Sequence, residues 1–189
     1  MDTKLHVAWF SWMMMVPFVW FTLLARRTFL VPNRGRPGLI LGGVSMVAGF
    51  ALAGWTGLHG AYVQAFWAGS AILAICSVVL YESARRVVTG RGFCSVLSGE
   101  VPPAVCTVGP YRYIRHPVYT SYLLAFLGFV VAFPGLPSAA VFAGNLVFFV
   151  LAAAHEERTI AHSPLAQAYA SYRQLAGMFL PRFGRADAP

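Results

Sequence analysis

Two polar clusters at the ends of apolar runs carry the side chains that could do chemistry in this chain. The first occupies residues 109–119 and combines two guanidinium groups, an imidazole and three phenols in the sequence Gly-Pro-Tyr-Arg-Tyr-Ile-Arg-His-Pro-Val-Tyr. The second, residues 155–158, ends the next apolar run and reads His-Glu-Glu-Arg. Ionisable groups are costly near a hydrocarbon core and mark functional sites there. The two clusters are therefore the predicted site, and they offer both signs of charge to a small ligand.

The first cluster is suited to hold an anion at the start of a helix. Pro117 fits the first turn of a helix, where its missing N–H has no effect, so His116 is the predicted cap residue. The N–H groups of that turn carry partial positive charge, and Arg112 and Arg115 add forked donors that match a carboxylate. Tyr119 lies one turn further along, on the face that carries His116. Anchoring of the chain at a membrane surface by Arg and Tyr is the alternative function of these residues.

The second cluster places two adjacent carboxylates at the end of an apolar helix. Asn145 and Glu156 fall on one helical face, and Glu157 lies about 100° round the helix from Glu156. Adjacent carboxylates repel each other and lose hydration when they are packed against a bundle, so they need positive partners. The first cluster supplies these partners if the two apolar runs form a hairpin. Solvated glutamates just beyond the end of the helix are the alternative.

Composition predicts that membrane-spanning helices position these clusters. The chain of 189 residues is 58% hydrophobic and 11% charged, which is outside the range of ordinary soluble domains. Five apolar runs approach or reach the roughly 20 residues that cross a hydrocarbon core, and none shows the polar outer face of a soluble bundle. We expect an all-α integral membrane fold with five transmembrane helices, in which the last two form a helical hairpin. The predicted spans are Leu5–Ala25, Gly38–Leu58, Ala61–Tyr81, Pro117–Phe133 and Ser138–Ala154.

The chain is predicted to form a single membrane domain over residues 1–189. Residues 1–81 are expected to be a three-helix scaffold, in which small residues at four-residue spacing let helices approach closely. Residues 82–116 are expected to form a cytosolic loop, and residues 117–189 the hairpin with the C-terminal segment that completes the predicted site. After Ser163, apolar residues recur at three- and four-residue spacing. This pattern predicts a C-terminal amphipathic cytosolic helix that covers the polar clusters.

The distribution of basic residues predicts the orientation in the membrane. All Lys and Arg residues except Lys4 lie in three segments on one side of the predicted spans. By the positive-inside rule, the N-terminus faces out and the C-terminus faces the cytoplasm. The net charge of +8 then reflects topology and anionic lipid headgroups, and no nucleic-acid partner is expected. Scarce Lys beside abundant Arg, Ala and Gly indicates a bacterial origin. Together with the predicted spans, it predicts a multi-pass protein of a bacterial inner membrane.

Neither a metal site nor a Rossmann-type nucleotide site is expected. Cys94, Cys106 and His116 are the conceivable metal ligands, but their spacing is irregular and the sequence has no Cys-x-x-Cys pair. The glycines at residues 90–92 do not form a Gly-x-Gly-x-x-Gly pattern after a strand. A nucleotide-like cofactor would therefore have to bind in another way.

The order of motifs along the chain resembles the isoprenylcysteine carboxyl methyltransferase family, which is related to integral-membrane phospholipid N-methyltransferases. The resemblance covers residues 105–182 in motif detail, and the combination of motifs is more specific than any single one. It rests on the block at residues 109–119, the pair Glu156-Glu157, the segment Tyr169-x-x-Tyr172-Arg173 and the end Leu180-Pro181-Arg182.

This resemblance implies transfer of a methyl group from S-adenosylmethionine to a lipophilic acceptor, a carboxylate or an amine, at the cytosolic membrane face. It also implies a cofactor pocket formed by the last two transmembrane helices and the C-terminal segment. The residues that it assigns to the cofactor are Tyr113, Arg115, His116, Pro117, Tyr119, Glu156 and Glu157. The predicted catalytic residues are Arg115, Glu156 and Glu157, and the predicted residues at the acceptor are Asn145, Tyr172 and Arg173.

One departure from the family pattern concerns the acceptor. Family members commonly carry Val-Pro-Arg where this chain has Ala176-Gly177-Met178. Loss of that Arg removes an anchor for an acceptor carboxylate, so we expect a small hydrophobic or lipid-like acceptor that reaches the site from the bilayer. Two alternatives remain open. One is an NADPH-dependent membrane reductase of the sterol or steroid type, whose C-terminal half is distantly similar, and the other is a non-catalytic membrane module.

Overall fold

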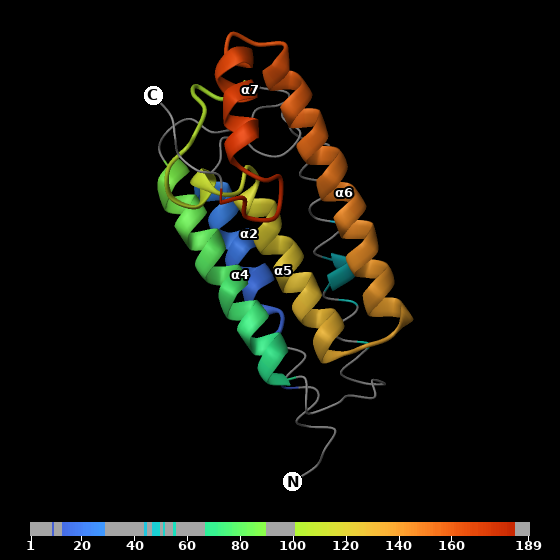
Figure 1. Ribbon diagram of the computed structural model, residues 1–189. Helices are drawn as coiled ribbons and strands as arrows, with labels where there is room; N and C mark the ends of the chain where they lie inside the picture. Colours follow the sequence, from blue (N-terminus) through green and yellow to red (C-terminus); the bar gives the residue numbers. More distant parts are fainter. Residues whose placement is uncertain are drawn as a thin grey trace.

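The part of the chain that the structure describes is mostly helical. The computed structural model describes residues 9, 13–28, 44, 47–49, 51, 55, 67–89 and 101–183, and no β-strand occurs within them. The elements, in chain order, are α2 (Val16–Thr28), α4 (Trp67–Val88), the short 3-10 helix η3 (Gly109–Arg112), α5 (Pro117–Ala132), α6 (Leu136–Ala161) and α7 (Ala166–Leu175). Figure 1 shows α2, α4 and α5 side by side, with α6 inclined beside α5 and α7 next to the end of α6.

Aromatic residues from three helices form the centre of the core. The rings of Phe18 on α2 and Phe126 on α5 lie 4.6 Å apart, measured between centroids. The ring of Phe21 lies 4.3 Å from that of Tyr81 on α4. All four side chains are buried, and rings of this size contribute a large share of the apolar area in a core. This packing holds α5, whose first turn carries part of the candidate site.

Small residues let α4 and α5 approach closely. A Cβ added at Gly128 of α5 would lie 3.3 Å from the carbonyl oxygen of Ser70 on α4. The hydroxyl of Ser77 donates a hydrogen bond of 2.7 Å to the carbonyl of Ser121. Close backbone approach of this kind is how helices associate in lipid, where burial of apolar surface supplies little driving force.

Two of the described helices, α4 and α6, are long and apolar enough to cross a membrane. The apolar helix α5 is shorter, with 16 residues. Most of the predicted span Gly38–Leu58, part of Leu5–Ala25 and the first six residues of Ala61–Tyr81 lie outside the described residues. The structure therefore supports a helical membrane protein, and five crossings remain a prediction.

Helix α4 continues beyond its predicted end at Tyr81, as far as Val88. The carboxylate of Glu82 accepts hydrogen bonds from Arg85 at 2.5 Å and 2.9 Å and from Arg86 at 3.0 Å. Pairs at three- and four-residue spacing stabilise a helix. The segment 82–116, predicted as a cytosolic loop, consequently begins as helix.

The ends of α6 and α7 also differ from the predicted bounds. α6 was expected to end at Ala154 but continues to Ala161, so Glu156 and Glu157 lie inside the helix. The alternative of solvated glutamates beyond a helix end is therefore wrong. Before α7, the hydroxyl of Ser163 accepts the N–H of Leu165 at 3.1 Å. This bond belongs to a turn, and the helix starts after it.

Candidate active site

The turn that leads into α5 directs Arg115 and His116 toward the end of α6. Pro117 is the first residue of α5 and His116 is its N-cap, as predicted. The His116 side chain makes no cap hydrogen bond, so its imidazole is available to other partners. The backbone N–H groups of Arg115 and His116 donate to the carbonyls of Gly177 at 2.7 Å and Met178 at 3.1 Å. These bonds fix the backbone from which the two side chains project.

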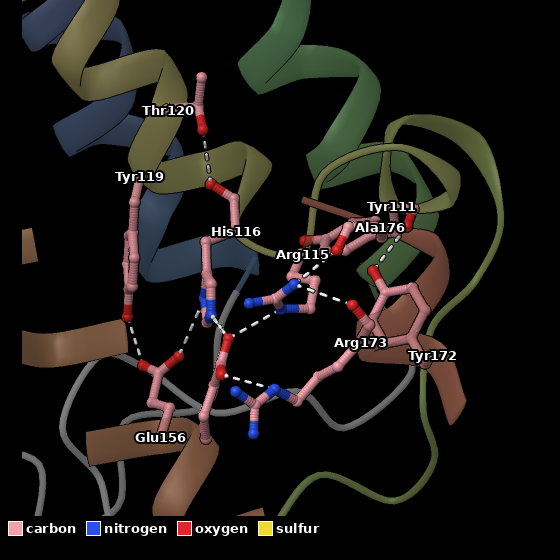
Figure 2. Close-up of polar contacts among 10 residues, drawn as sticks. Tyr111, Arg115, His116, Tyr119, Thr120, Glu156, Tyr172, Arg173 and Ala176 are labelled. Carbon is pink, nitrogen blue, oxygen red and sulfur yellow. Dashed lines mark hydrogen bonds and ion pairs between the residues drawn. The ribbon is translucent and has the colours of Figure 1, made fainter. Parts of the chain in front are cut away.

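Glu157 of α6 is surrounded by positively charged or donating groups. Its Oε1 accepts a hydrogen bond of 2.8 Å from Nε of Arg115 and lies 3.2 Å from Nε2 of His116. Its Oε2 lies 3.3 Å from Nε of Arg173 on α7. Figure 2 shows these contacts converging between the start of α5, α6 and α7. The Glu157 side chain is only 7% exposed, and its partners offset the loss of hydration that burial imposes on a carboxylate.

Glu156 shares His116 with Glu157 but is more exposed. Its Oε2 lies 3.6 Å from Nδ1 of His116, and its Oε1 accepts a hydrogen bond from the hydroxyl of Tyr119. The two ring nitrogens of His116 thus face one carboxylate each (Figure 2). The Glu156 side chain is 32% exposed. We refer to Arg115, His116, Glu156, Glu157 and Arg173 together as the ion-pair cluster.

Stacked aromatic rings connect this cluster to the core. The ring of Tyr119 stacks on His116 with a centroid distance of 5.4 Å and an angle of 3° between the planes. Tyr119 also stacks on Phe149 of α6 at 5.2 Å, and Phe149 stacks on Tyr122 of α5 at 5.5 Å. Offset stacking of this type favours a fixed relative position of the rings. It holds α5 against α6 about two turns before Glu156.

The segment after α7 runs beside the turn that precedes α5. The N–H groups of Gly177 and Arg182 both donate to the carbonyl of Tyr113 at 3.0 Å. The hydroxyl of Thr120 donates to the carbonyl of Phe179 at 3.0 Å. These bonds join parts of the chain that are about 60 to 70 residues apart. The C-terminal segment therefore lies directly against the first polar cluster.

Two side chains fix the position of α7. Nη1 of Arg115 donates to the carbonyls of Ala176 at 2.5 Å and Arg173 at 3.4 Å, which are at the C-terminal end of α7. The hydroxyl of Tyr172 donates a hydrogen bond of 2.5 Å to the carbonyl of Tyr111. Burial raises the pKa of Tyr172, so the phenol keeps the proton that it donates. Arg115 thus binds both a carboxylate of α6 and the end of α7.

The structure brings most of the predicted site residues together. One connected network of hydrogen bonds and ion pairs contains Arg115, His116, Tyr119, Glu156, Glu157 and Arg173, and Pro117 contributes through the start of α5. The ring of Tyr113 lies elsewhere, packed on Phe183 with a centroid distance of 5.4 Å. Asn145 lies three turns from Glu156 in α6, and Tyr172 anchors α7.

Some groups that hold the cluster were not predicted. The carbonyls of Ala176, Gly177 and Met178 accept hydrogen bonds from Arg115 and His116, whereas the sequence marked these residues only as a departure from a family pattern. Backbone acceptors leave no trace in residue type. The residue type of Gly177 is the exception, because a glycine can indicate close backbone packing. A Cβ at this position would lie 2.1 Å from the carbonyl oxygen of Leu180.

The fold and the site define a class of protein: apolar helices that hold a buried ion-pair cluster where their ends meet. A model of the phospholipid methyltransferase family matches residues 64–163, more than half of the chain. The chain belongs to the phospholipid methyltransferase family. No curated protein and no solved structure matches the chain. The matched range contains α4, α5 and α6 with both polar clusters, and α7 follows it.

Membership of this family indicates a methyltransferase that acts on lipid substrates. Together with the two apolar helices, it indicates a membrane protein. The family match supports the broader group of integral-membrane methyltransferases. The narrower resemblance to isoprenylcysteine carboxyl methyltransferases remains a prediction from the motifs.

Proposed function

We propose that this protein is an S-adenosylmethionine-dependent methyltransferase that methylates a carboxylate or an amine of a lipophilic acceptor at the cytosolic face of the membrane. One observation carries the proposal: a buried Glu157 is paired with Arg115, His116 and Arg173, next to a partly exposed Glu156. Because the chain belongs to the phospholipid methyltransferase family, we assign the binding of the methyl donor to this cluster.

The donors and acceptors of the cluster fit the amino-acid end of S-adenosylmethionine, which carries an ammonium and a carboxylate group. The Glu156 side chain is 32% exposed, so its carboxylate can pair with an ammonium group. The Arg173 side chain is 54% exposed, and its forked guanidinium can pair with a carboxylate. A carboxylate and a guanidinium group are thus offered beside Glu157, because Glu156 is its neighbour in α6 and Arg173 pairs with its Oε2. When bound, the cofactor would supply a methyl group on a sulfonium, and the neutral thioether that remains after transfer is the leaving group.

The two glutamates take different roles in this proposal. Glu157 is buried and contacts three donors, so it acts as a positioning residue that sets Arg115 and Arg173. Glu156 is more exposed and contacts the ligand. If the acceptor is an amine, Glu156 also takes up its proton, whereas a carboxylate acceptor needs no base.

The remaining residues orient the reactants and exclude water. Tyr119 donates a hydrogen bond to Glu156 and stacks on His116, which limits the positions that the carboxylate can adopt. Tyr113, 38% exposed, is proposed to contact the aromatic end of the cofactor. Tyr172 acts indirectly by holding α7 in place. Methyl transfer from a sulfonium mainly requires alignment and a dry site, which the C-terminal segment favours by packing against the turn before α5.

The test is thermal unfolding of the detergent-solubilised protein with S-adenosylhomocysteine or with NADPH. We expect S-adenosylhomocysteine to raise the Tm by several degrees, because a ligand at about 100 times its Kd stabilises the folded state by about 2.7 kcal/mol. NADPH should leave the Tm unchanged. Stabilisation by NADPH alone would indicate a membrane reductase, and a lack of response to both compounds would indicate a non-catalytic module.

A further inference from the structure

Asn145 of α6 is a buried amide whose oxygen is unpaired within the described part of the chain. Its side-chain N–H donates a hydrogen bond of 2.9 Å to the carbonyl of Val141, one turn earlier in the helix. Among the residues that the structure describes, its Oδ1 has no hydrogen-bond partner, although the residue is only 6% exposed. An amide oxygen that is removed from water and left unpaired destabilises the folded protein. Buried polar groups of this kind are rare in native proteins, and each one requires an explanation.

Asn145 does not lie on the lipid-facing side of α6. The lipid-facing side is marked by Val147 and Leu151, which are 58% and 64% exposed. Asn145 is buried and lies one turn from Phe149, whose ring packs on Tyr119 and Tyr122 of α5. The amide therefore belongs to the face of α6 that is turned toward the bundle.

Asn145 and Glu156 lie along the same side of one apolar helix. They are separated by 11 positions, which at the helical rise corresponds to about 16 Å along the axis. An elongated molecule that lies beside α6 with its reactive end at Glu156 would place a point about 16 Å along its apolar part next to Asn145. Intramembrane polar residues that face the interior of a bundle commonly mark the path or the site of a substrate.

We propose that Oδ1 of Asn145 accepts a hydrogen bond from an O–H or N–H group within the apolar part of the lipid acceptor. This inference rests on the proposed function and narrows the acceptor to a long-chain lipid with a donor group well below its head group. Ester-linked acyl chains are plain hydrocarbon in that region and carry no donor, so a lipid with unsubstituted chains does not satisfy Asn145. Binding of the acceptor thus supplies the hydrogen bond that no described residue provides.

The test compares the wild type with Asn145→Leu, which keeps the approximate size of the side chain and removes both polar groups. The probes are stearate and a hydroxystearate with the hydroxyl in mid-chain, together with the corresponding amines, and their Kd values are measured by thermal shift, which requires no turnover. We expect the wild type to bind the hydroxylated probes about tenfold more tightly, the effect of one hydrogen bond. Asn145→Leu should lose this preference, show a higher Tm without ligand and keep the wild-type response to S-adenosylhomocysteine.

Ser138→Ala is the matched control, because Ser138 is also a buried polar residue of α6 but its hydroxyl donates to the carbonyls of Phe133 and Gly135. This variant should have a lower Tm and an unchanged preference for the hydroxyl. Equal binding of both probes by the wild type, or a preference that persists in Asn145→Leu, would overturn the proposal. Failure of the wild type to respond to S-adenosylhomocysteine contradicts the proposed function instead, and the comparison of probes still decides the role of Asn145.

Discussion

Glu156 and Glu157 are neighbours in α6 with different surroundings. The Glu157 carboxylate is enclosed by groups from the turn before α5 and from α7, whereas a third of the Glu156 side chain is exposed. Removing one partner of a buried ion pair leaves the other charge unpaired and destabilises a protein by about 3–5 kcal/mol. Pairs that remain in contact with solvent contribute about 0–1 kcal/mol. The two glutamates should therefore differ in their effect on stability and on ligand binding.

Replacing each glutamate by glutamine separates these effects. We expect Glu157→Gln to lower the free energy of unfolding by about 3 kcal/mol, because the guanidinium of Arg115 loses its buried counter-charge. Glu156→Gln should lower it by less than about 1 kcal/mol but weaken binding of S-adenosylhomocysteine at least about tenfold, through loss of a charge-assisted hydrogen bond. Denaturant unfolding and ligand-induced thermal shift in detergent measure the two quantities.

Glu82→Gln is the control for removal of a carboxylate from an ion pair. Glu82 pairs with Arg85 and Arg86 on α4, away from the ion-pair cluster. Its replacement should leave the binding of S-adenosylhomocysteine unchanged. If Glu156→Gln destabilises the protein as much as Glu157→Gln does, or binds the ligand normally, the assignment of separate roles is incorrect.

Side-chain direction is the part of the site that could not be predicted from the sequence. The types and spacing of Arg115, His116, Glu156 and Glu157 were sufficient to place them in one cluster, because opposite charges at adjacent helix ends must pair. Tyr113 belongs to the same motif, but its ring packs on Phe183, and the guanidinium of Arg112 lies 5.8 Å above the ring. This orientation depends on the turn that ends η3 and on Phe183, which is far from Tyr113 in the sequence.

At the scale of elements, the position of α7 depends on the backbone that follows it. Gly177 accepts the N–H of Arg115 and donates its own N–H to Tyr113, so both of its peptide groups hold the C-terminal segment in place. The family pattern of Val-Pro-Arg would put proline at this position, which has no N–H to donate. Glycine is needed here because the carbonyl oxygen of Leu180 occupies the space of a Cβ.

Gly177→Ala should therefore displace the C-terminal segment. A Cβ at 2.1 Å from the Leu180 carbonyl oxygen is a steric clash with backbone, and overpacking of this kind costs about 1–3 kcal/mol. We expect faster amide hydrogen exchange in residues 176–182 and weaker binding of S-adenosylhomocysteine, because Arg115 and Arg173 lose their fixed positions. Hydrogen exchange measured by mass spectrometry reports the first effect and thermal shift the second.

Gly144→Ala provides a matched glycine substitution in α6. A Cβ at Gly144 meets nothing within 4 Å, and alanine is favoured over glycine inside a helix by about 0.5–1 kcal/mol. This variant should be neutral or slightly more stable, with normal ligand binding. Unchanged exchange in the C-terminal segment of Gly177→Ala would show that the segment adopts another path.

Helix ends were less predictable than helix positions. The apolar runs located α4, α5 and α6, but two of these helices continue into polar sequence. In α4 the extension is stabilised by the Glu82 pairs, and in α6 by partners of Glu157 from other elements. Hydropathy indicates where a helix can lie in a membrane, whereas tertiary ion pairs determine how far it extends into the interface.

At the scale of the whole molecule, the lengths of α5 and α6 relate the cluster to the membrane. At the helical rise, the 26 residues of α6 span about 39 Å and the 16 residues of α5 about 24 Å, compared with a hydrocarbon core of about 30 Å. The inclination of α6 relative to α5 takes up part of this difference (Figure 1). The hairpin turn and the ion-pair cluster should therefore lie at opposite surfaces of the membrane.

Cysteine labelling in intact cells tests this arrangement together with the orientation inferred from the basic residues. In a background in which Cys76, Cys94 and Cys106 are replaced by serine, Leu136→Cys marks the exposed hairpin turn and Ser171→Cys the exposed side of α7. We expect a membrane-impermeant maleimide to label Leu136→Cys from outside, and Ser171→Cys only after permeabilisation, because basic residues are retained in the cytoplasm. The reverse pattern would contradict the positive-inside assignment. Labelling of both positions from the same side would show that α5 and α6 do not form a membrane-crossing hairpin, and the proposed site would then lack its position at the cytosolic face.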